Sequence, residues 1–162
     1  MIPTLHTDRL TLRGPEAGDW PAFRDYFLSE RSIFNGGPYE TAKKAWILFA
    51  AELGHWALHG FGMWTVTRDD TPIGLVGCWY PEGWPDRELG WLLWDGYEGQ
   101  GYATEAAIAA RAHAFGAFGW DKAVSYIHRE NTRSIALAER LGCTRDTAAV
   151  HPHPDALGFR HP

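Results

Sequence analysis

Three glycines separate an apolar segment from an alanine-rich segment near the middle of the chain. The apolar segment, 87–94 (RELGWLLW), is typical of a buried strand, and the segment from about 104 to 118 is typical of a helix. Between them lie Gly96, Gly99 and Gly101. Glycine allows positive φ, so successive N–H groups can converge on a ligand, and a helix N-terminus adds unpaired donors and about half a positive charge. The junction therefore predicts a phosphate site at the start of the helix.

The spacing of the glycines excludes two well-known phosphate turns. A dinucleotide-binding turn needs Gly-x-Gly-x-x-Gly, but here Thr104 follows Gly99 and Gly101 at the third position. A P-loop needs a lysine after its second glycine, and Tyr102 stands there instead. A turn that only redirects the chain and begins the helix remains the alternative.

The rest of the chain predicts a single domain, 1–162, with a mixed α/β sheet. Period-2 patterns predict strands over 5–13, 61–67, 73–80, 87–94 and 122–128, with an edge strand over 156–160. Helices are expected from Asp19 to a break at 36–38, over about 40–58, over about 104–118, and from Asn131 to Gly142.

Three details of these helices are specific expectations. Asp19 and Asn131 are of the residue types that cap helix N-termini, and Pro21 suits a first helical turn. In the second helix the spacing of apolar residues predicts one buried face, made of Trp46, Phe49, Ala50, Leu53 and Ala57.

Charge and composition narrow the classes of partner. The net charge is −5 and no run of Lys or Arg is longer than two, which argues against a nucleic-acid partner. No apolar run approaches 18 residues and no leader-like segment opens the chain, so we expect a cytoplasmic protein that neither spans a membrane nor is secreted.

The cysteines and the histidine-rich tail predict no special chemistry. Cys78 and Cys143 are expected to be free thiols, and Cys143 is read as inert because no histidine or lysine stands near it in the sequence. The tail histidines lack a fixed ligand spacing, so no metal site is predicted; they are His151, His153 and His161.

Three segments together resemble the GNAT acetyltransferase superfamily, and within it the ribosomal-protein-alanine acetyltransferase-like (RimJ/RimL-type) branch. They are the opening 5–13 (LHTDRLTLR), the junction from 88–93 (ELGWLL) into 99–106 (GQGYATEA), and 131–142 (NTRSIALAERLG). The similarity spans roughly residues 5 to 145, and the junction is its most specific part.

The resemblance implies a fold and a reaction. The fold is a central, mostly antiparallel sheet flanked by helices, in which the strands before the glycine turn and before Asn131 splay apart. The reaction is transfer of an acetyl group from acetyl-CoA, used as a cosubstrate, to a primary amine on a protein N-terminus or a small molecule, by direct attack on the thioester. Relatives are often dimers, which leaves a homodimer open.

The resemblance also implies which residues hold the donor. Pantetheine would pair with the backbone of Leu92, Leu93 and Trp94, and Asn131 would reach the pantetheine arm. The family usually has Arg or Gln at the position of Glu98, so we expect Glu98 to point to solvent and the grip to be mainly through backbone amides. The pyrophosphate would meet the glycine turn and the helix start, that is, Glu98, Gly99, Gln100, Gly101, Tyr102, Ala103 and Thr104.

The chemistry requires a base and a proton donor. Glu88 is the candidate base, directly or through a water, because it lies on the strand that faces the gap; a solvated strand-end carboxylate is the alternative. The oxyanion would meet a backbone N–H around Leu92 or Leu93. Many relatives carry a tyrosine where this chain has Ala138, so Ser134 is the candidate proton donor, with helix capping as its alternative.

Two readings of function therefore stay open. The first is an N-acetyltransferase with an unidentified amine acceptor. The second is a non-catalytic acyl-CoA-binding module or sensor, which the absent tyrosine and Glu98 favour. Turnover in the presence of acetyl-CoA separates the two.

Overall fold

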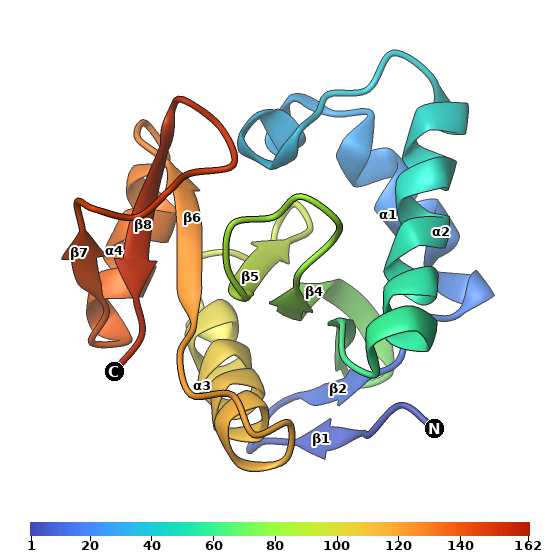
Figure 1. Ribbon diagram of the computed structural model, residues 1–162. Coiled ribbons are helices and arrows are strands. Elements are labelled where there is room, and N and C mark those ends of the chain that lie inside the picture. Colours follow the sequence, from blue (N-terminus) through green and yellow to red (C-terminus); the bar gives the residue numbers. More distant parts are fainter.

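A computed structural model describes residues 1–162 and contains one eight-stranded sheet (Figure 1). The strands are β1 (Leu5–His6), β2 (Thr11–Arg13), β3 (Met63–Arg68), β4 (Thr71–Trp79), β5 (Glu88–Leu93), β6 (Val124–His128), β7 (Thr144–Asp146) and β8 (Ala156–Arg160). The helices are α1 (Trp20–Phe27), α2 (Ala42–His59), α3 (Tyr102–Gly116) and α4 (Thr132–Arg140), with short 3-10 helices η1 (Ala17–Asp19) and η2 (Glu30–Asn35).

The strand order is β1-β2-β3-β4-β5-β6-β8-β7, and every neighbouring pair is antiparallel except β5 with β6. The expected β3–β4 hairpin is present. Its turn residues Asp69 and Asp70 both have positive φ, as a two-residue hairpin turn that follows the sheet twist requires. The architecture is therefore the predicted mixed α/β fold with a mostly antiparallel sheet.

Two apolar clusters, one on each face, hold the helices against the sheet. One cluster joins α3 and α4 to the sheet and includes Trp64, Ile73 and Leu93. The other joins α1 and α2 to the sheet and includes Phe23 and Trp94. Because side chains alternate along a strand, β5 contributes to both clusters, and α1–α2 and α3–α4 lie on opposite sides of it (Figure 1).

The N-terminal segment 5–13 is two short strands rather than the single strand that its alternation predicts. The chain reverses between β1 and β2, where the Thr7 N–H donates to the Leu10 carbonyl at 2.9 Å and the Leu10 N–H donates to Thr7 Oγ1 at 3.0 Å. The alternation is in fact interrupted here, because the polar residues 6–9 separate Leu5 from Leu10 and the apolar positions change from odd to even numbers, so the prediction of one strand overlooked a visible break.

The buried face of α2 differs from the predicted one. Trp46 is 56% exposed and Leu53 is 38% exposed, and only Phe49 of the predicted set is buried. The observed face is Ala45, Phe49, Glu52, His55 and Trp56. Two polar residues belong to it, one of them His55, whose ring nitrogens bond to the Phe61 carbonyl and the Tyr80 N–H, so apolar spacing could not identify it.

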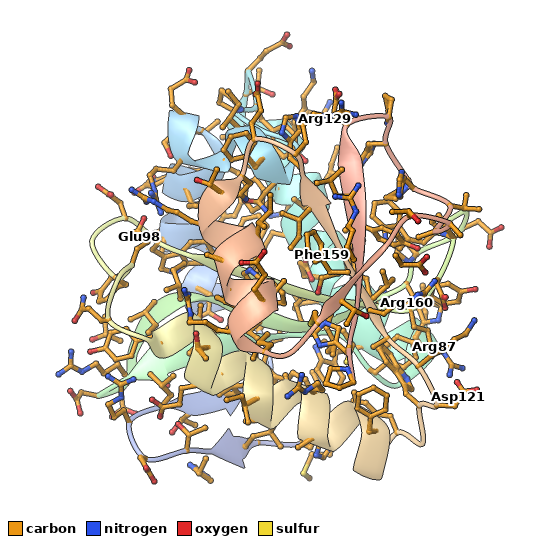
Figure 2. All side chains as sticks on the ribbon, turned by 90° about the vertical axis from the view of Figure 1, so that its left-hand side faces the viewer. Arg87, Glu98, Asp121, Arg129, Phe159 and Arg160 are labelled. Carbon is orange, nitrogen blue, oxygen red and sulfur yellow. The ribbon has the colours of Figure 1, made fainter.

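The C-terminal strand β8 was predicted to lie at the edge of the sheet. It lies instead between β6 and β7. The edge strand is β7, which was not predicted. Arg160 explains part of this arrangement, because its guanidinium bonds to Asp146 of β7 at 2.8 Å and to Asp86 of the β4–β5 loop at 2.7 Å. Figure 2 shows Phe159 and Arg160 on this strand, on the side of the molecule that faces the viewer.

Asp19 directly precedes α1, as predicted, but its side chain does not cap that helix. Its carboxylate is 2% exposed and accepts hydrogen bonds from Arg13 at 2.7 and 2.9 Å, Thr65 Oγ1 at 2.7 Å and the Glu16 N–H at 3.0 Å. The carboxylate therefore ties β2, β3 and η1 together.

Asp19→Asn should lower the free energy of unfolding by about 2 kcal/mol at neutral pH, because the amide loses charge-assisted bonds and leaves Arg13 poorly paired. Burial opposes ionisation of Asp19, but the bonds from Arg13, Glu16 and Thr65 outweigh it and lower the pKa. The stabilisation is therefore lost as pH falls through this lowered pKa, and the two proteins should converge in acid. Urea unfolding at several pH values measures this difference; a constant difference at all pH values would contradict it.

Candidate active site

The strands β5 and β6 diverge after a single paired position. Glu88 is in register with Val124, and the Val124 N–H donates to the Arg87 carbonyl at 3.0 Å. Beyond this point side chains bridge the strands: Ser125 Oγ donates to the Leu89 carbonyl at 2.5 Å, and the Tyr126 N–H donates to Glu88 Oε1 at 3.2 Å. The splay implied by the family resemblance is therefore present, and Glu88 lies at its apex.

Two adjoining hollows occupy the gap between these strands. The larger has a volume of about 1330 Å³ and is bounded by η2, β5, the glycine turn and α4. The smaller has a volume of about 60 Å³ and lies at Glu88 and Tyr126. Both are lined by the same five residues where they meet, namely Phe34, Asn35, Trp91, Asn131 and Ser134.

The glycine turn opens into the larger hollow. Gly99 and Gly101 have φ of +73° and +80°, and Gly101 is the N-cap of α3 with no side chain capping the helix. The predicted residues that line the hollow are Glu98, Gly99, Gly101, Tyr102, Ala103 and Thr104, whereas Gln100 does not line it. The Gln100 side chain instead donates to the Gly96 carbonyl at 3.3 Å. The hollow thus ends at a helix N-terminus, the geometry that binds an anion.

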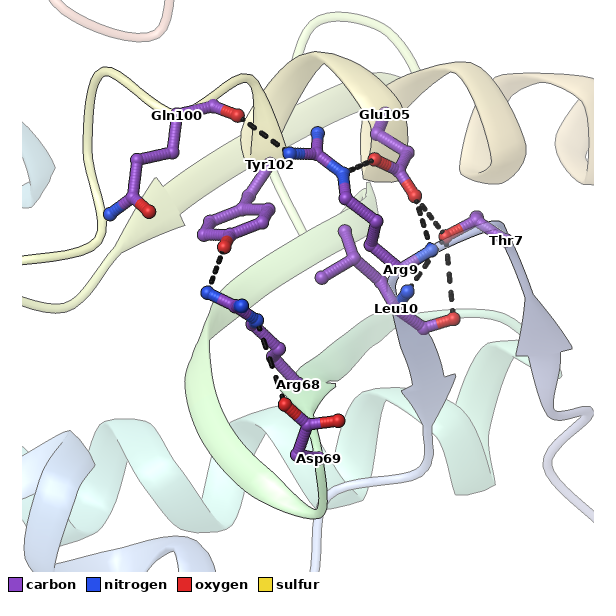
Figure 3. A network of polar contacts seen from close by, with 8 residues as sticks. All are labelled: Thr7, Arg9, Leu10, Arg68, Asp69, Gln100, Tyr102 and Glu105. Carbon is purple, nitrogen blue, oxygen red and sulfur yellow. Dashed lines mark hydrogen bonds and ion pairs between the residues drawn. The ribbon is translucent and has the colours of Figure 1, made fainter.

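A network of polar contacts holds the glycine turn to the β1–β2 turn and to the end of β3 (Figure 3). Arg9, in the β1–β2 turn, donates to the Gln100 carbonyl at 3.0 Å and to the Glu105 carboxylate at 2.7 Å. Its guanidinium lies 4.6 Å from the centre of the Tyr102 ring, and Arg68 bonds to the Tyr102 hydroxyl. Because its ring and hydroxyl are engaged here, Tyr102 can serve a ligand only through its backbone.

The backbone groups of β5 that face the gap differ from those predicted. The Trp94 N–H donates to the Ile73 carbonyl at 2.8 Å, and the Trp94 side chain is buried in the α1–α2 cluster, so Trp94 does not reach the gap. Alternate residues of a strand direct their backbone groups to opposite edges. Leu92 lines the hollow, but its backbone N–H and carbonyl are directed toward β4. The carbonyls of Leu89 and Leu93 face the gap.

The Glu88 carboxyl group is half-buried, and each of its oxygens accepts a hydrogen bond, so it is not the solvated strand-end carboxylate that was the alternative. Its Oε2 accepts from the Trp84 indole at 2.7 Å and its Oε1 from the Tyr126 N–H. Burial raises its pKa to about 7, although the bonds from Trp84 and Tyr126 act in the opposite direction. A carboxyl with a pKa near neutrality has the property expected of a general base.

Ser134 lies between the two hollows, and its hydroxyl does not cap α4. The cap is Asn131, as predicted, since Asn131 Oδ1 accepts from the Ser134 N–H at 3.2 Å. The Ser134 hydroxyl accepts from the Trp91 indole at 3.2 Å, which leaves its own proton free for another acceptor. Ala138 has only a methyl side chain, which is fully buried, so that position supplies no acid.

Glu98 does not point to solvent. Its side chain is 25% exposed, forms an ion pair with Arg31 of η2, and has Arg133 Nη1 at 3.8 Å. The reason is electrostatic, because two cations from neighbouring elements attract the carboxylate toward the hollow. Figure 2 shows Glu98 in the loop before α3, beside α4.

No role at the donor site was predicted for η2, whose residues from 33 onward were expected only as part of an acceptor loop (33–39). It supplies Arg31, Phe34 and Asn35 to the lining. This segment was predicted to belong to one helix from Asp19 to the break at 36–38, but α1 ends at Phe27 and residues 30–35 form the separate 3-10 helix η2, so the predicted helix did not assign them to the site. The one available signal was the unusual acid Glu98 in the glycine turn, which calls for a basic partner.

Cys143 does have a histidine partner, contrary to the expectation. Its Sγ lies 3.3 Å from His161 Nδ1, and His161 Nε2 lies 2.9 Å from Ser125 Oγ. Burial raises the pKa of Cys143 to about 11 and lowers that of His161 to about 4, so both groups are neutral at pH 7. The expected inertness is thus compatible with the structure, even though its stated reason was wrong.

No group of three or more His, Cys, Asp or Glu side chains is placed to hold a metal ion. No helix is both long and apolar enough to cross a bilayer.

Comparison with known proteins places this geometry in a family. The family model for the acetyltransferase (GNAT) domain matches residues 9–144. An acetyltransferase from Agrobacterium tumefaciens is 41% identical, with a TM-score of 0.95 over 100% of this chain and 95% of that one.

Two more distant structures share the fold. A protein from Vibrio cholerae, proposed to be a ribosomal-protein-serine acetyltransferase, is 22% identical with a TM-score of 0.79 over 100% of both chains. RimL, an α-N-acetyltransferase of a ribosomal protein that was solved with coenzyme A, is 16% identical with a TM-score of 0.79 over 98% of this chain and 97% of that one.

Proposed function

Because the chain belongs to the GNAT acetyltransferase family, we propose that it transfers an acetyl group from acetyl-CoA to a primary amine by direct attack on the thioester. The observation that carries the proposal is the splay of β5 and β6. One gap receives both the amides of the glycine turn, which suit the donor's phosphates, and the raised-pKa carboxyl of Glu88, which suits an amine.

Each end of the gap has a role in this proposal. The pyrophosphate binds the amides from Gly99 to Ala103, and pantetheine extends along the free edge of β5 past Leu93. The acetyl group then lies near the junction of the two hollows, and a gap-facing N–H of β5, at Trp91 or Leu93, stabilises the oxyanion. The candidate oxyanion donors from the sequence were the N–H groups of Leu92 and Leu93. Trp91 takes the place of Leu92 here, because the Leu92 backbone faces β4.

The proton transfers balance in the same geometry. The amine nitrogen forms the C–N bond to the thioester carbonyl while Glu88 takes a proton from it, directly or through a water in the smaller hollow. The oxyanion then re-forms the C=O bond as the C–S bond breaks. The departing thiolate takes a proton through the Ser134 hydroxyl, which regains one from solvent as Glu88 returns the amine proton to solvent. Asn131 fixes the first turn of α4 and so the place of Ser134.

We extend the proposal to a RimJ/RimL-like role in the cytoplasm, with a protein N-terminus as the first acceptor to try. The names of RimL and of the Vibrio cholerae protein support this choice. The two cysteines, both unpaired and buried, suit a reducing compartment.

Turnover with acetyl-CoA tests the enzyme directly. The protein is incubated with acetyl-CoA and a panel of N-terminal peptides, diamines and other small amines, and released CoA is measured together with the mass of each acceptor. Release of CoA with an acetylated acceptor supports the proposal. Tight CoA binding without turnover on any acceptor favours a non-catalytic binding module instead.

The rate should depend on pH through the ionisation of Glu88. Because its pKa is raised to about 7 by burial, the base form disappears as pH falls below neutrality. After correction for the neutral fraction of the amine, kcat/KM should fall about tenfold per pH unit below about pH 7. Stopped assays from pH 5.5 to 9 measure this limb, and a flat corrected profile would exclude Glu88 as base.

A further inference from the structure

The segment η2 lines one side of the larger hollow, which we call the donor hollow because CoA is proposed to bind there. Arg31 connects η2 to two other walls of this hollow. Its guanidinium forms an ion pair with Glu98 of the glycine turn, and its Nη2 donates to the Leu93 carbonyl at 3.4 Å. Its Nε lies 3.9 Å from an Asp95 carboxylate oxygen, outside hydrogen-bond distance, and is buried without a hydrogen-bond partner. Arg31 thus lines the hollow and has one donor, the buried Nε, without a partner.

The charge of Glu98 makes this arginine necessary for an anion. Glu98 is fixed to the turn because its carboxylate accepts the Gly96 N–H at 3.1 Å. A carboxylate held next to a pyrophosphate repels it unless a cation lies between them. Arg31 is the best placed cation, since its side chain is 31% exposed, whereas that of Arg133 is 77% exposed and lies 3.8 Å from Glu98.

We infer that Arg31 is a donor-binding residue that contacts the phosphates of CoA, and that Glu98 is a positioning residue that holds the guanidinium over the hollow. When the guanidinium turns toward the hollow, a phosphate oxygen supplies the partner that its Nε lacks, through a charge-assisted hydrogen bond. Arg31 also leaves the Leu93 carbonyl, which becomes free for the pantetheine arm. This inference rests on the proposed use of acetyl-CoA.

The pair explains how an acid can stand in the glycine turn. The family resemblance implies a cation or an amide at the position of Glu98, within the turn itself. In this chain the cation is Arg31 of η2, and Glu98 in the turn orients it. The donor grip thus combines backbone amides with one side chain from a distant segment.

A double-variant cycle with CoA tests this coupling by calorimetry. Arg31→Gln should weaken CoA binding at least tenfold, because it removes the cation and leaves Glu98 facing the phosphates. In the Glu98→Gln background the same change should cost at most about one third as much, because no acid remains to be balanced. The affinity of Arg31→Gln should also depend less on KCl concentration than that of the wild type.

Arg24→Gln is the matched control, because Arg24 is a surface arginine on α1 that pairs only with its neighbour Asp25. It should bind CoA as the wild type does, and circular dichroism should show that all variants are folded. Wild-type affinity in Arg31→Gln, or the same loss in both Glu98 backgrounds, would overturn the inference while the proposed function stands. A wild-type protein that does not bind CoA would instead overturn the proposed function.

Discussion

Replacing Gly101 with aspartate should weaken CoA binding by at least about 100-fold, roughly 2.7 kcal/mol, while the protein remains folded. Gly101 has a φ of +80°, where a side chain costs about 1–2 kcal/mol, and it is the N-cap of α3. The added carboxylate would stand where the backbone donors meet the phosphates. Like charges a few ångströms apart repel each other by several kcal/mol when they are partly shielded from water. Calorimetric titration with CoA measures the loss.

Two further variants separate charge from backbone strain. A Cβ at Gly101 would lie 3.3 Å from an Arg9 nitrogen, so Gly101→Ala carries the strain and crowding without the charge and should lose less affinity than Gly101→Asp. Gly119→Asp makes the same change at a φ of +65°, beyond the other end of α3, with no atom near the new Cβ. If Gly101→Asp binds CoA as tightly as Gly119→Asp, the glycine turn does not hold the phosphates.

The glycine turn was predictable because its signal is local. A strand, three glycines and a helix follow one another in the sequence, and their backbone conformations depend mostly on their own residue types. Asn131 was predictable for the same reason, since a cap bonds within its own first turn. The splay of β5 and β6 came from the family resemblance and not from periodicity.

The errors concern features that are set by tertiary contacts. The direction of the Trp94 backbone depends on the register with β4, which places its N–H on Ile73. The buried face of α2 contains Glu52 and His55, so hydrophobic spacing chose a face that includes the exposed Trp46. Contacts between distant segments leave no mark on local patterns.

The pair of Arg31 and Glu98 illustrates the same limit within the site. Each residue alone is an ordinary charged side chain in an irregular segment. Their pairing follows only once the fold places η2 against the glycine turn. The family resemblance did mark Glu98 as unusual for its position, but the expectation drawn from it was a side chain in solvent, and only the structure shows the compensating cation.

Replacing Glu88 with glutamine should lower kcat by about 100- to 1,000-fold, the usual contribution of a general base, without weakening CoA binding. Glu88 does not line the donor hollow, so calorimetry should give the wild-type CoA affinity. Glutamine can still accept the Tyr126 N–H at the apex, although its amide cannot satisfy both of the partners that the carboxylate has. The low-pH limb of the rate should disappear from the residual activity.

Two other changes distinguish a base from a carboxylate that only holds the strands together. Glu82→Gln alters an exposed acid of the β4–β5 loop, which precedes Glu88, and should leave both kcat and the pH profile unchanged. Trp84→Phe removes the indole donor that lowers the pKa of Glu88, so it should move the low-pH limb to higher pH while activity at alkaline pH persists. A structural role predicts lost stability but no shift of the limb. Wild-type turnover in Glu88→Gln at every pH would remove Glu88 from the mechanism.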